Sequence, residues 1–132
     1  VVFLTPRLLF GADVINILKE EYGYNCMHTF GELPPPDNDE NLDKALINKQ
    51  KQMFFQSKTG SALLRGTTIH SFKGYEASDL VVYIDAHQFC TKSLIYVALT
   101  RLLGVVPNPR ITVICARSDL VSYGKTWPNF IN

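Results

Sequence analysis

The chain has 132 residues, of which 46% are hydrophobic and 19% charged, and its formal net charge is +1. This length suits one domain with a buried core, residues 1–132. The charge balance excludes a polycation, so any nucleic-acid surface must come from local clustering. The sequence has no apolar run long enough to span a membrane, and its start lacks the basic lead of a signal peptide.

The three cysteines, Cys26, Cys90 and Cys115, are far apart and lack metal-ligand spacing. We expect buried free thiols, which fit a reducing cytoplasm. The chain begins inside a strand-like run without Met. We therefore expect a domain of a longer, cytoplasmic protein.

The first segment predicts a strand, a short loop and a helix. Val1–Leu4 is apolar, and Pro6 ends the strand. Residues 12–22 follow as a helix, with apolar side chains on one face, and Gly23 is suited to a left-handed cap. Arg7 comes just after the strand, where ligands of open α/β sheets bind, so it is either a ligand contact or a solvated arginine.

The next segment is less regular. Residues 24–29 predict a short strand, and the proline-rich acidic run 31–40 (GELPPPDNDE) predicts an exposed loop. Residues 41–57 predict a helix that carries several lysines and the pair Phe54–Phe55. These groups suit either nucleic-acid contact or, as we favour, a solvated face with two core aromatics.

The remaining elements alternate between strands and helices, which predicts an α/β fold with a mostly parallel sheet flanked by helices. Strands are expected at 61–68, 79–85 and 111–116, and helices at 92–103 and 118–123.

The polar run 67–76 precedes the apolar strand 80–84 and carries most of the candidate chemistry. Thr68 and His70 are two residues apart, so a strand would point both toward one ligand. Lys73 and Gly74 offer a donor and a close backbone approach to phosphate, and Glu76 can accept a hydrogen bond from ribose. Taken singly, each also suits a structural role in a strand, core, turn or helix start.

The run Leu94–Arg101 (LIYVALTR) is mostly apolar and ends in two polar residues, Thr100 and Arg101. Together with Thr68–Glu76 (TIHSFKGYE), in the same order and at a matching separation, it resembles the last motifs of the UvrD/Rep-like superfamily 1 DNA helicases. The resemblance implies a RecA-like, P-loop NTPase-type fold and the role of the second, C-terminal motor domain. It also implies ATP-dependent DNA helicase activity for the full-length protein.

In that family, the threonine and histidine of the first motif face single-stranded DNA. The resemblance therefore implies that Thr68 and His70 contact single-stranded DNA, and we assign Lys73 and Arg7 to the same surface.

The resemblance also implies a nucleotide site. Gly74 and Glu76 would approach the bound nucleotide, and Arg101 would reach the terminal phosphate of ATP as an arginine finger. On a helical wheel, Arg101 lies at the border of the apolar face. From this position we expect it to reach a neighbouring surface.

The sequence lacks the G-x-x-x-x-G-K-[ST] phosphate loop and has only Asp85 after a strand to hold magnesium. We therefore expect this chain alone to bind no metal, ATP or Mg²⁺ and to be inactive. ATP and Mg²⁺ would bind in the full-length protein, with a first RecA-like motor domain as partner. Two alternatives are a non-catalytic nucleic-acid-binding or protein-interaction module, and an unrelated doubly wound enzyme with its site around His70 and Glu76.

Overall fold

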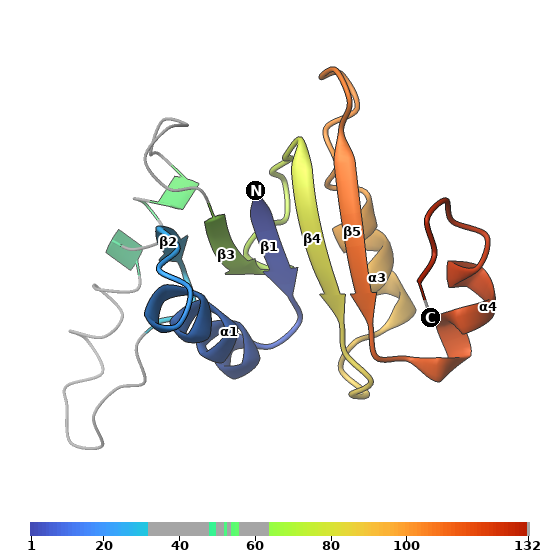
Figure 1. Ribbon diagram of the computed structural model, residues 1–132, viewed down its shortest axis with the longest axis horizontal. Coiled ribbons are helices and arrows are strands. Elements are labelled where there is room, and N and C mark those ends of the chain that lie inside the picture. The colour runs from blue at the N-terminus through green and yellow to red at the C-terminus, as the bar shows by residue number, and fades with distance from the viewer. Residues whose placement is uncertain (32–47, 50–51, 53, 56–63, 132) are drawn as a thin grey trace.

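The computed structural model describes residues 1–31, 48–49, 52, 54–55 and 64–131. Its strands form a parallel sheet in the order β2-β3-β1-β4-β5, with helices on both faces (Figure 1). The strands are β1 (Val2–Thr5), β2 (Cys26–His28), β3 (Leu64–Thr68), β4 (Asp79–Ile84) and β5 (Arg110–Cys115). The helices are α1 (Leu8–Glu20), α3 (Lys92–Leu99), the 3-10 turn η1 (Ser118–Leu120) and α4 (Val121–Gly124). The expected parallel α/β architecture is confirmed.

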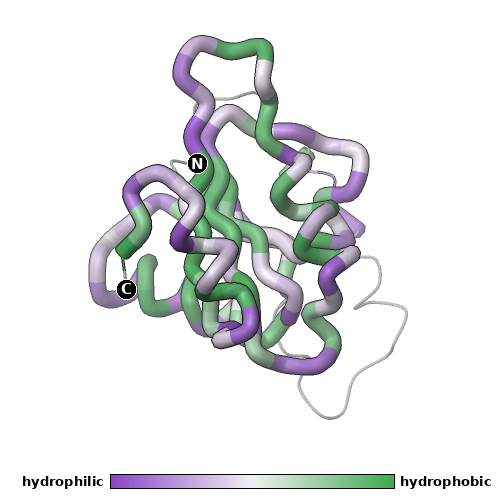
Figure 2. Tube along the Cα trace, turned by 90° about the vertical axis from the view of Figure 1, so that its right-hand side faces the viewer, coloured by the Kyte–Doolittle hydropathy of each residue, from purple (hydrophilic) through white to green (hydrophobic). Residues whose placement is uncertain are grey.

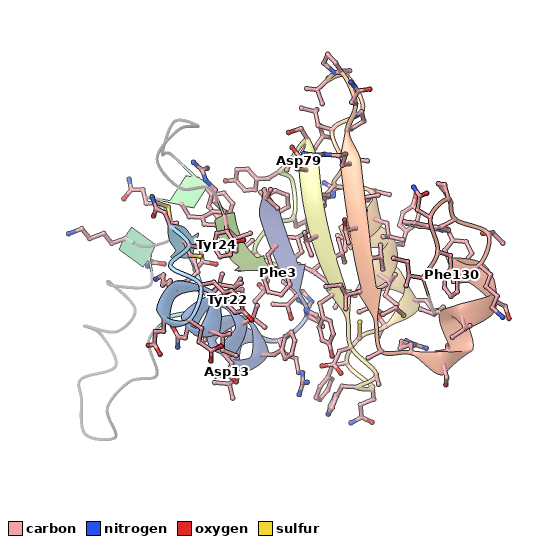
Figure 3. All side chains as sticks on the ribbon, in the orientation of Figure 1. Phe3, Asp13, Tyr22, Tyr24, Asp79 and Phe130 are labelled. Atoms are coloured by element: carbon pink, nitrogen blue, oxygen red, sulfur yellow. The ribbon has the colours of Figure 1, made fainter. Side chains whose placement is uncertain are left out.

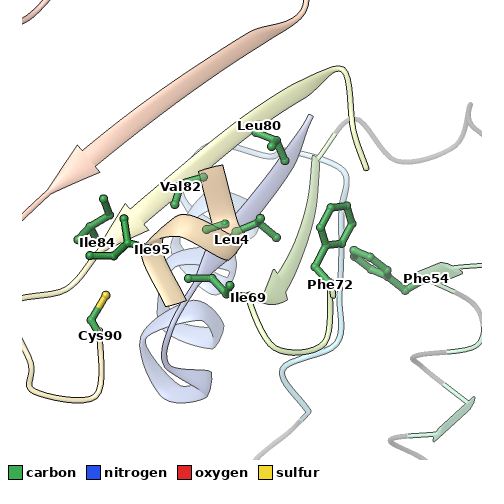
Figure 4. Close-up of a cluster of buried hydrophobic side chains, with 10 residues drawn as sticks. Leu4, Phe54, Ile69, Phe72, Leu80, Val82, Ile84, Cys90 and Ile95 are labelled. Carbon is green, nitrogen blue, oxygen red and sulfur yellow. The ribbon is translucent and has the colours of Figure 1, made fainter. Parts of the chain in front are cut away.

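The central strands are apolar because both faces of the sheet are covered. On one face, Phe3 of β1 packs with Ile15 of α1 and with Phe30. On the other, Leu4 of β1 and Val82 of β4 belong to a cluster that includes α3 (Figure 4), whose full membership is Leu4, Phe54, Ile69, Phe72, Leu80, Val82, Ile84, Cys90, Ile95 and Ala98. Figure 2 shows this as hydrophobic segments along the strands in the middle of the trace.

The order of the strands creates a switch point between β1 and β4. From β1 the chain passes through α1 to β2 on one side, whereas from β4 it passes through α3 to β5 on the other. In open parallel sheets, ligands bind outside the carboxyl ends of the strands at such a point. Register aligns these ends: Thr5 is the partner of Thr68, and Ile84 is the partner of Cys115.

Helix α1 begins at Leu8, four residues earlier than the sequence predicted, and ends at Glu20. Gly11 lies inside it rather than ahead of it, and a Cβ there would overlap the ring of Phe30. Glycine at this position therefore permits close packing against the sheet. Gly23 has φ +67°, so the predicted left-handed residue after the helix is confirmed.

Helix α3 ends at Leu99, whereas the sequence predicted an end at 103. The backbone after it pairs with the segment before β4 instead: Ala77 N–H donates to the Arg101 carbonyl at 3.0 Å, and Leu103 N–H donates to the Ala77 carbonyl at 2.9 Å. Leu102 and Ala77 thus form an isolated parallel bridge. This non-local pairing competes with helix continuation and wins, so the prediction was wrong for the last turn.

The remaining strands and η1 with α4 lie close to their predicted ranges. Residues 32–40 of the proline-rich loop, most of the predicted helix 41–57 and the strand start 61–63 lie outside the described residues. Phe54 is only 2% exposed, which supports a core role. Phe55 stacks on Tyr75 with ring centroids 4.0 Å apart.

The cysteines are free, as expected, but only Cys90 is buried. Cys26 is half-buried and Cys115 is exposed, because Cys115 is the last residue of β5, the final strand in the sheet order. Burial raises the pKa of the Cys90 thiol. None of the described helices is long and apolar enough to cross a membrane.

Candidate functional site

The residues singled out in the sequence divide between the two ends of the sheet. Thr68 ends β3 at the carboxyl edge, near Arg7, which follows β1. Glu76 and Arg101 lie at the amino edge, where β4 and β5 begin and where Asp79 is labelled in Figure 3. The segment from Ile69 to Ser78 connects the two ends.

Thr68 is 9% exposed, and its hydroxyl is engaged locally. Its Oγ1 donates to Ser71 Oγ at 3.0 Å and accepts from the Ser71 N–H at 3.2 Å. The Phe72 N–H also donates to the Thr68 carbonyl at 3.1 Å. Thr68 therefore fixes the turn after β3.

His70 does not share a strand face with Thr68. Strand β3 ends at Thr68, Ile69 is fully buried, and His70 is exposed in the turn that follows. The strand-alternation argument was wrong for this pair because the Thr68–Ser71 hydrogen bonds turn the chain. His70 still lies at the carboxyl edge, on an exposed surface.

His70 and Lys73 line a shallow hollow of about 250 Å³ beside the start of α3. Thr91, the N-cap of α3, accepts a hydrogen bond from the Leu94 N–H at 3.2 Å and forms part of its wall. The other lining residues are Ile69, Ser93, Leu94 and Val97. The structure thus brings two predicted DNA contacts, His70 and Lys73, onto one surface.

Arg7 lies at the switch point and forms an ion pair from its Nε to Asp85 Oδ2. The Arg7 side chain is 47% exposed, whereas that of Asp85 is 8% exposed. Asp85 Oδ1 accepts from the His87 N–H at 3.0 Å. Arg7 is therefore a half-exposed arginine that is held on one side by an ion pair.

Gly74 and Glu76 lie on an exposed loop. Gly74 has φ +90° and no atom within 4 Å of a Cβ placed on it, so the backbone is open to a ligand there. Glu76 is followed directly by Ala77, which pairs with Leu102. This bridge brings the chain at Glu76 next to the chain at Arg101.

Arg101 lies beyond the end of α3, not within a longer helix. Its Nε donates to the Val97 carbonyl at 3.1 Å, and its Nη2 donates to Thr100 Oγ1 at 3.1 Å. These acceptors lie at the carboxyl end of the helix, where a cation is favoured. The guanidinium is therefore folded back onto α3 and partly buried.

Two side chains that we did not assign as sites are well fixed at the carboxyl edge. Asp85 is one of them, and its place directly after the apolar run of β4 is the sequence signal that could have identified it. Arg117 Nη1 donates to the Cys90 carbonyl at 2.7 Å, and its fork engages both carboxylate oxygens of Asp119 at 2.9 and 2.6 Å. Arg117 lines a second hollow of about 280 Å³ with Ala86, His87, Gln88, Ala116, Ser118 and Asp119.

At the amino edge, a second ion pair joins an arginine Nε to an aspartate oxygen, as in the pair Arg7–Asp85. Arg110 Nε donates to Asp79 Oδ1 at 2.7 Å. The two side chains are 78% and 31% exposed. The Arg110 hydrogen bond holds the pKa of Asp79 below its usual range.

The described residues contain no group of three or more histidine, cysteine, aspartate or glutamate side chains arranged to hold a metal ion. Searches of protein-family models, curated protein sequences and solved structures found no match to this chain. Any assignment of function therefore depends on the motifs and on this geometry.

Proposed function

We propose that the chain is the second RecA-like motor domain of a superfamily 1 DNA helicase. In this proposal ATP and Mg²⁺ are held mainly by a first motor domain, whose phosphate loop this sequence lacks. The present chain contributes an arginine to the ATP and a surface for single-stranded DNA.

The observation that best supports the proposal is the course of residues 69–78. The segment leaves the carboxyl edge beside Thr68 and ends at the amino edge, where Ala77 is hydrogen-bonded to Arg101 and Leu103. A proposed DNA contact and a proposed nucleotide contact are thus joined by one short length of backbone. A motor needs such a link, because nucleotide-driven movement at one end must reach the DNA at the other.

The residues at the amino edge suit an incomplete nucleotide site. Glu76 is exposed and can accept a hydrogen bond from a ribose hydroxyl, and Gly74 permits close approach of a ligand. Arg101 is folded back onto Val97 and Thr100, both within four residues of it. A rotation of its side chain would free the guanidinium to neutralise charge on a phosphate held by the first motor domain.

The residues at the carboxyl edge suit a phosphate-rich ligand. His70 and Lys73 are exposed on one surface, and Arg7 is half-exposed at the switch point. Lysine and arginine neutralise phosphates, so binding should weaken as salt is added.

A second candidate is a nucleic-acid-binding module without a motor. The absence of a phosphate loop from this sequence is expected of such a module as well as of a second motor domain. The two candidates differ in whether Arg101 matters to hydrolysis.

The test uses the full-length protein with Arg101→Ala, and Arg110→Ala as the control. If Arg101 stabilises the transition state, ATP hydrolysis should fall about 10³-fold or more, with a smaller effect on ATP binding. Arg101→Lys should rescue poorly because an ammonium lacks the planar fork. Hydrolysis at the parental rate in Arg101→Ala, or an equal loss in Arg110→Ala, would reject the motor.

A further inference from the structure

The pair Arg7–Asp85 is the most unusual charged feature of the described residues. Asp85 is 6% exposed, and acidic side chains are seldom buried to this extent unless they are paired. Apart from its ion pair with Arg7, Asp85 Oδ2 has no hydrogen-bond partner among the described residues. Burying a charge pair is costly and weak evidence for stability, so its position calls for another explanation.

That position is the switch point. Arg7 follows the carboxyl end of β1, and Asp85 follows the carboxyl end of β4, the neighbouring strand. The connections from these strands leave in opposite directions, which is where open parallel sheets bind ligands. The pair therefore lies where a ligand is expected on topology alone.

The geometry leaves one edge of the guanidinium available. Asp85 engages Nε of Arg7, and neither Nη group has a hydrogen-bond partner within the described part of the chain. The two Nη groups of an arginine match two oxygens of a phosphate. Helix α1 begins directly after Arg7 without an acidic residue in its first turn, so its positive end adds to the attraction.

We propose that Asp85 is a positioning residue that holds the Arg7 guanidinium at the switch point, with its Nη edge presented to a backbone phosphate of single-stranded nucleic acid. This inference rests on the proposed function and adds a residue to its DNA surface. A fixed guanidinium loses less side-chain entropy on binding than a mobile one, which favours affinity.

A rival explanation makes the opposite prediction. If Asp85 acts only by neutralising Arg7, its removal should strengthen phosphate binding. If Asp85 positions Arg7, its removal should weaken binding, although the protein becomes less negative.

The experiment measures binding of the 132-residue chain to a fluorescent oligo-dT strand by anisotropy, over a series of salt concentrations. Arg7→Gln should weaken binding about tenfold, as expected for a lost charged hydrogen bond. It should also reduce the slope of log affinity against log salt by about 0.7, one single-strand phosphate contact. Asp85→Asn should likewise weaken binding and reduce the salt slope. In a chain that already carries Arg7→Gln, adding Asp85→Asn should change the affinity and the slope little further.

The amino-edge pair provides matched controls. Arg110→Gln and Asp79→Asn remove an arginine or an aspartate of a similar Nε–carboxylate pair, far from the switch point, and should leave affinity and salt slope unchanged. Thermal melting of every variant separates binding from folding. If Asp85→Asn does not fold, Asp85→Glu takes its place, because it keeps the charge but displaces the guanidinium.

Parental or tighter binding by the folded Asp85 variant, with Arg7→Gln weakened, would overturn the positioning role alone. Parental binding by Arg7→Gln would overturn the phosphate contact. If the parent chain itself fails to bind the strand, the DNA-binding part of the proposed function is wrong, and this inference falls with it.

Discussion

The two edges of the sheet use similar residues in different environments. At the carboxyl edge, Asp85 is buried against Arg7, and the Thr68 hydroxyl is consumed by hydrogen bonds to Ser71. At the amino edge, the Asp79–Arg110 pair is more exposed, and the Arg101 guanidinium is hydrogen-bonded to its own helix end. The ion pair at the carboxyl edge is therefore the more buried of the two, and the one at the amino edge is the more exposed.

The largest difference in stability between the two edges should appear when Asp85 or Asp79 is replaced by alanine. Asp85→Ala leaves Arg7 without its partner and the His87 N–H without its acceptor, so we expect a loss of about 2–3 kcal/mol in the free energy of unfolding. This lies below the usual cost of breaking a buried pair because Arg7 is half-exposed. Urea denaturation of the parent and Asp85→Ala would measure it.

Asp79→Ala is the control for that measurement, because its pair is similar but exposed. Its unfolding midpoint should stay near that of the parent. Equal losses of stability in Asp85→Ala and Asp79→Ala would show that the two ion pairs contribute alike to stability despite their different exposure.

A smaller effect is expected at Thr68. Thr68→Val keeps the shape of the side chain but removes its bonds to Ser71, so unfolding should become easier by about 1 kcal/mol. Thr68→Ser should retain most of that stability, as checked by thermal melting. A Thr68→Val protein as stable as the parent would mean that these hydrogen bonds do not hold the turn, and that His70 is placed by other contacts.

The smallest effect should be the pH dependence of the Asp79–Arg110 pair. The pKa of Asp79 is lowered in the folded protein, so its contribution is present at neutral pH and lost as pH falls through the folded-state pKa. A slight difference in melting temperature between the parent and Asp79→Asn at pH 7 should therefore disappear in acid. A difference that grows as pH falls would contradict this sign.

Much of the fold follows from local patterns in the sequence. The apolar runs at 1–4 and 80–84 and the alternation of strands and helices predicted parallel α/β structure, which the sheet confirms. The glycine after α1 was correctly assigned a left-handed conformation. These features were predictable because strand burial and helix caps depend on residues close in sequence.

The sequence could not predict how distant segments alter local structure. Phe30 packs so closely on Gly11 that a Cβ there would overlap its ring, and α3 stops at Leu99 because Ala77 pairs with the chain beyond it. Arg7 and Asp85 are 78 positions apart in sequence, and only the pairing of β1 with β4 brings them together. The sequence by itself therefore determined which residues are candidates for chemistry, whereas the tertiary structure decided which of them share an edge, because strand order is set by non-local packing.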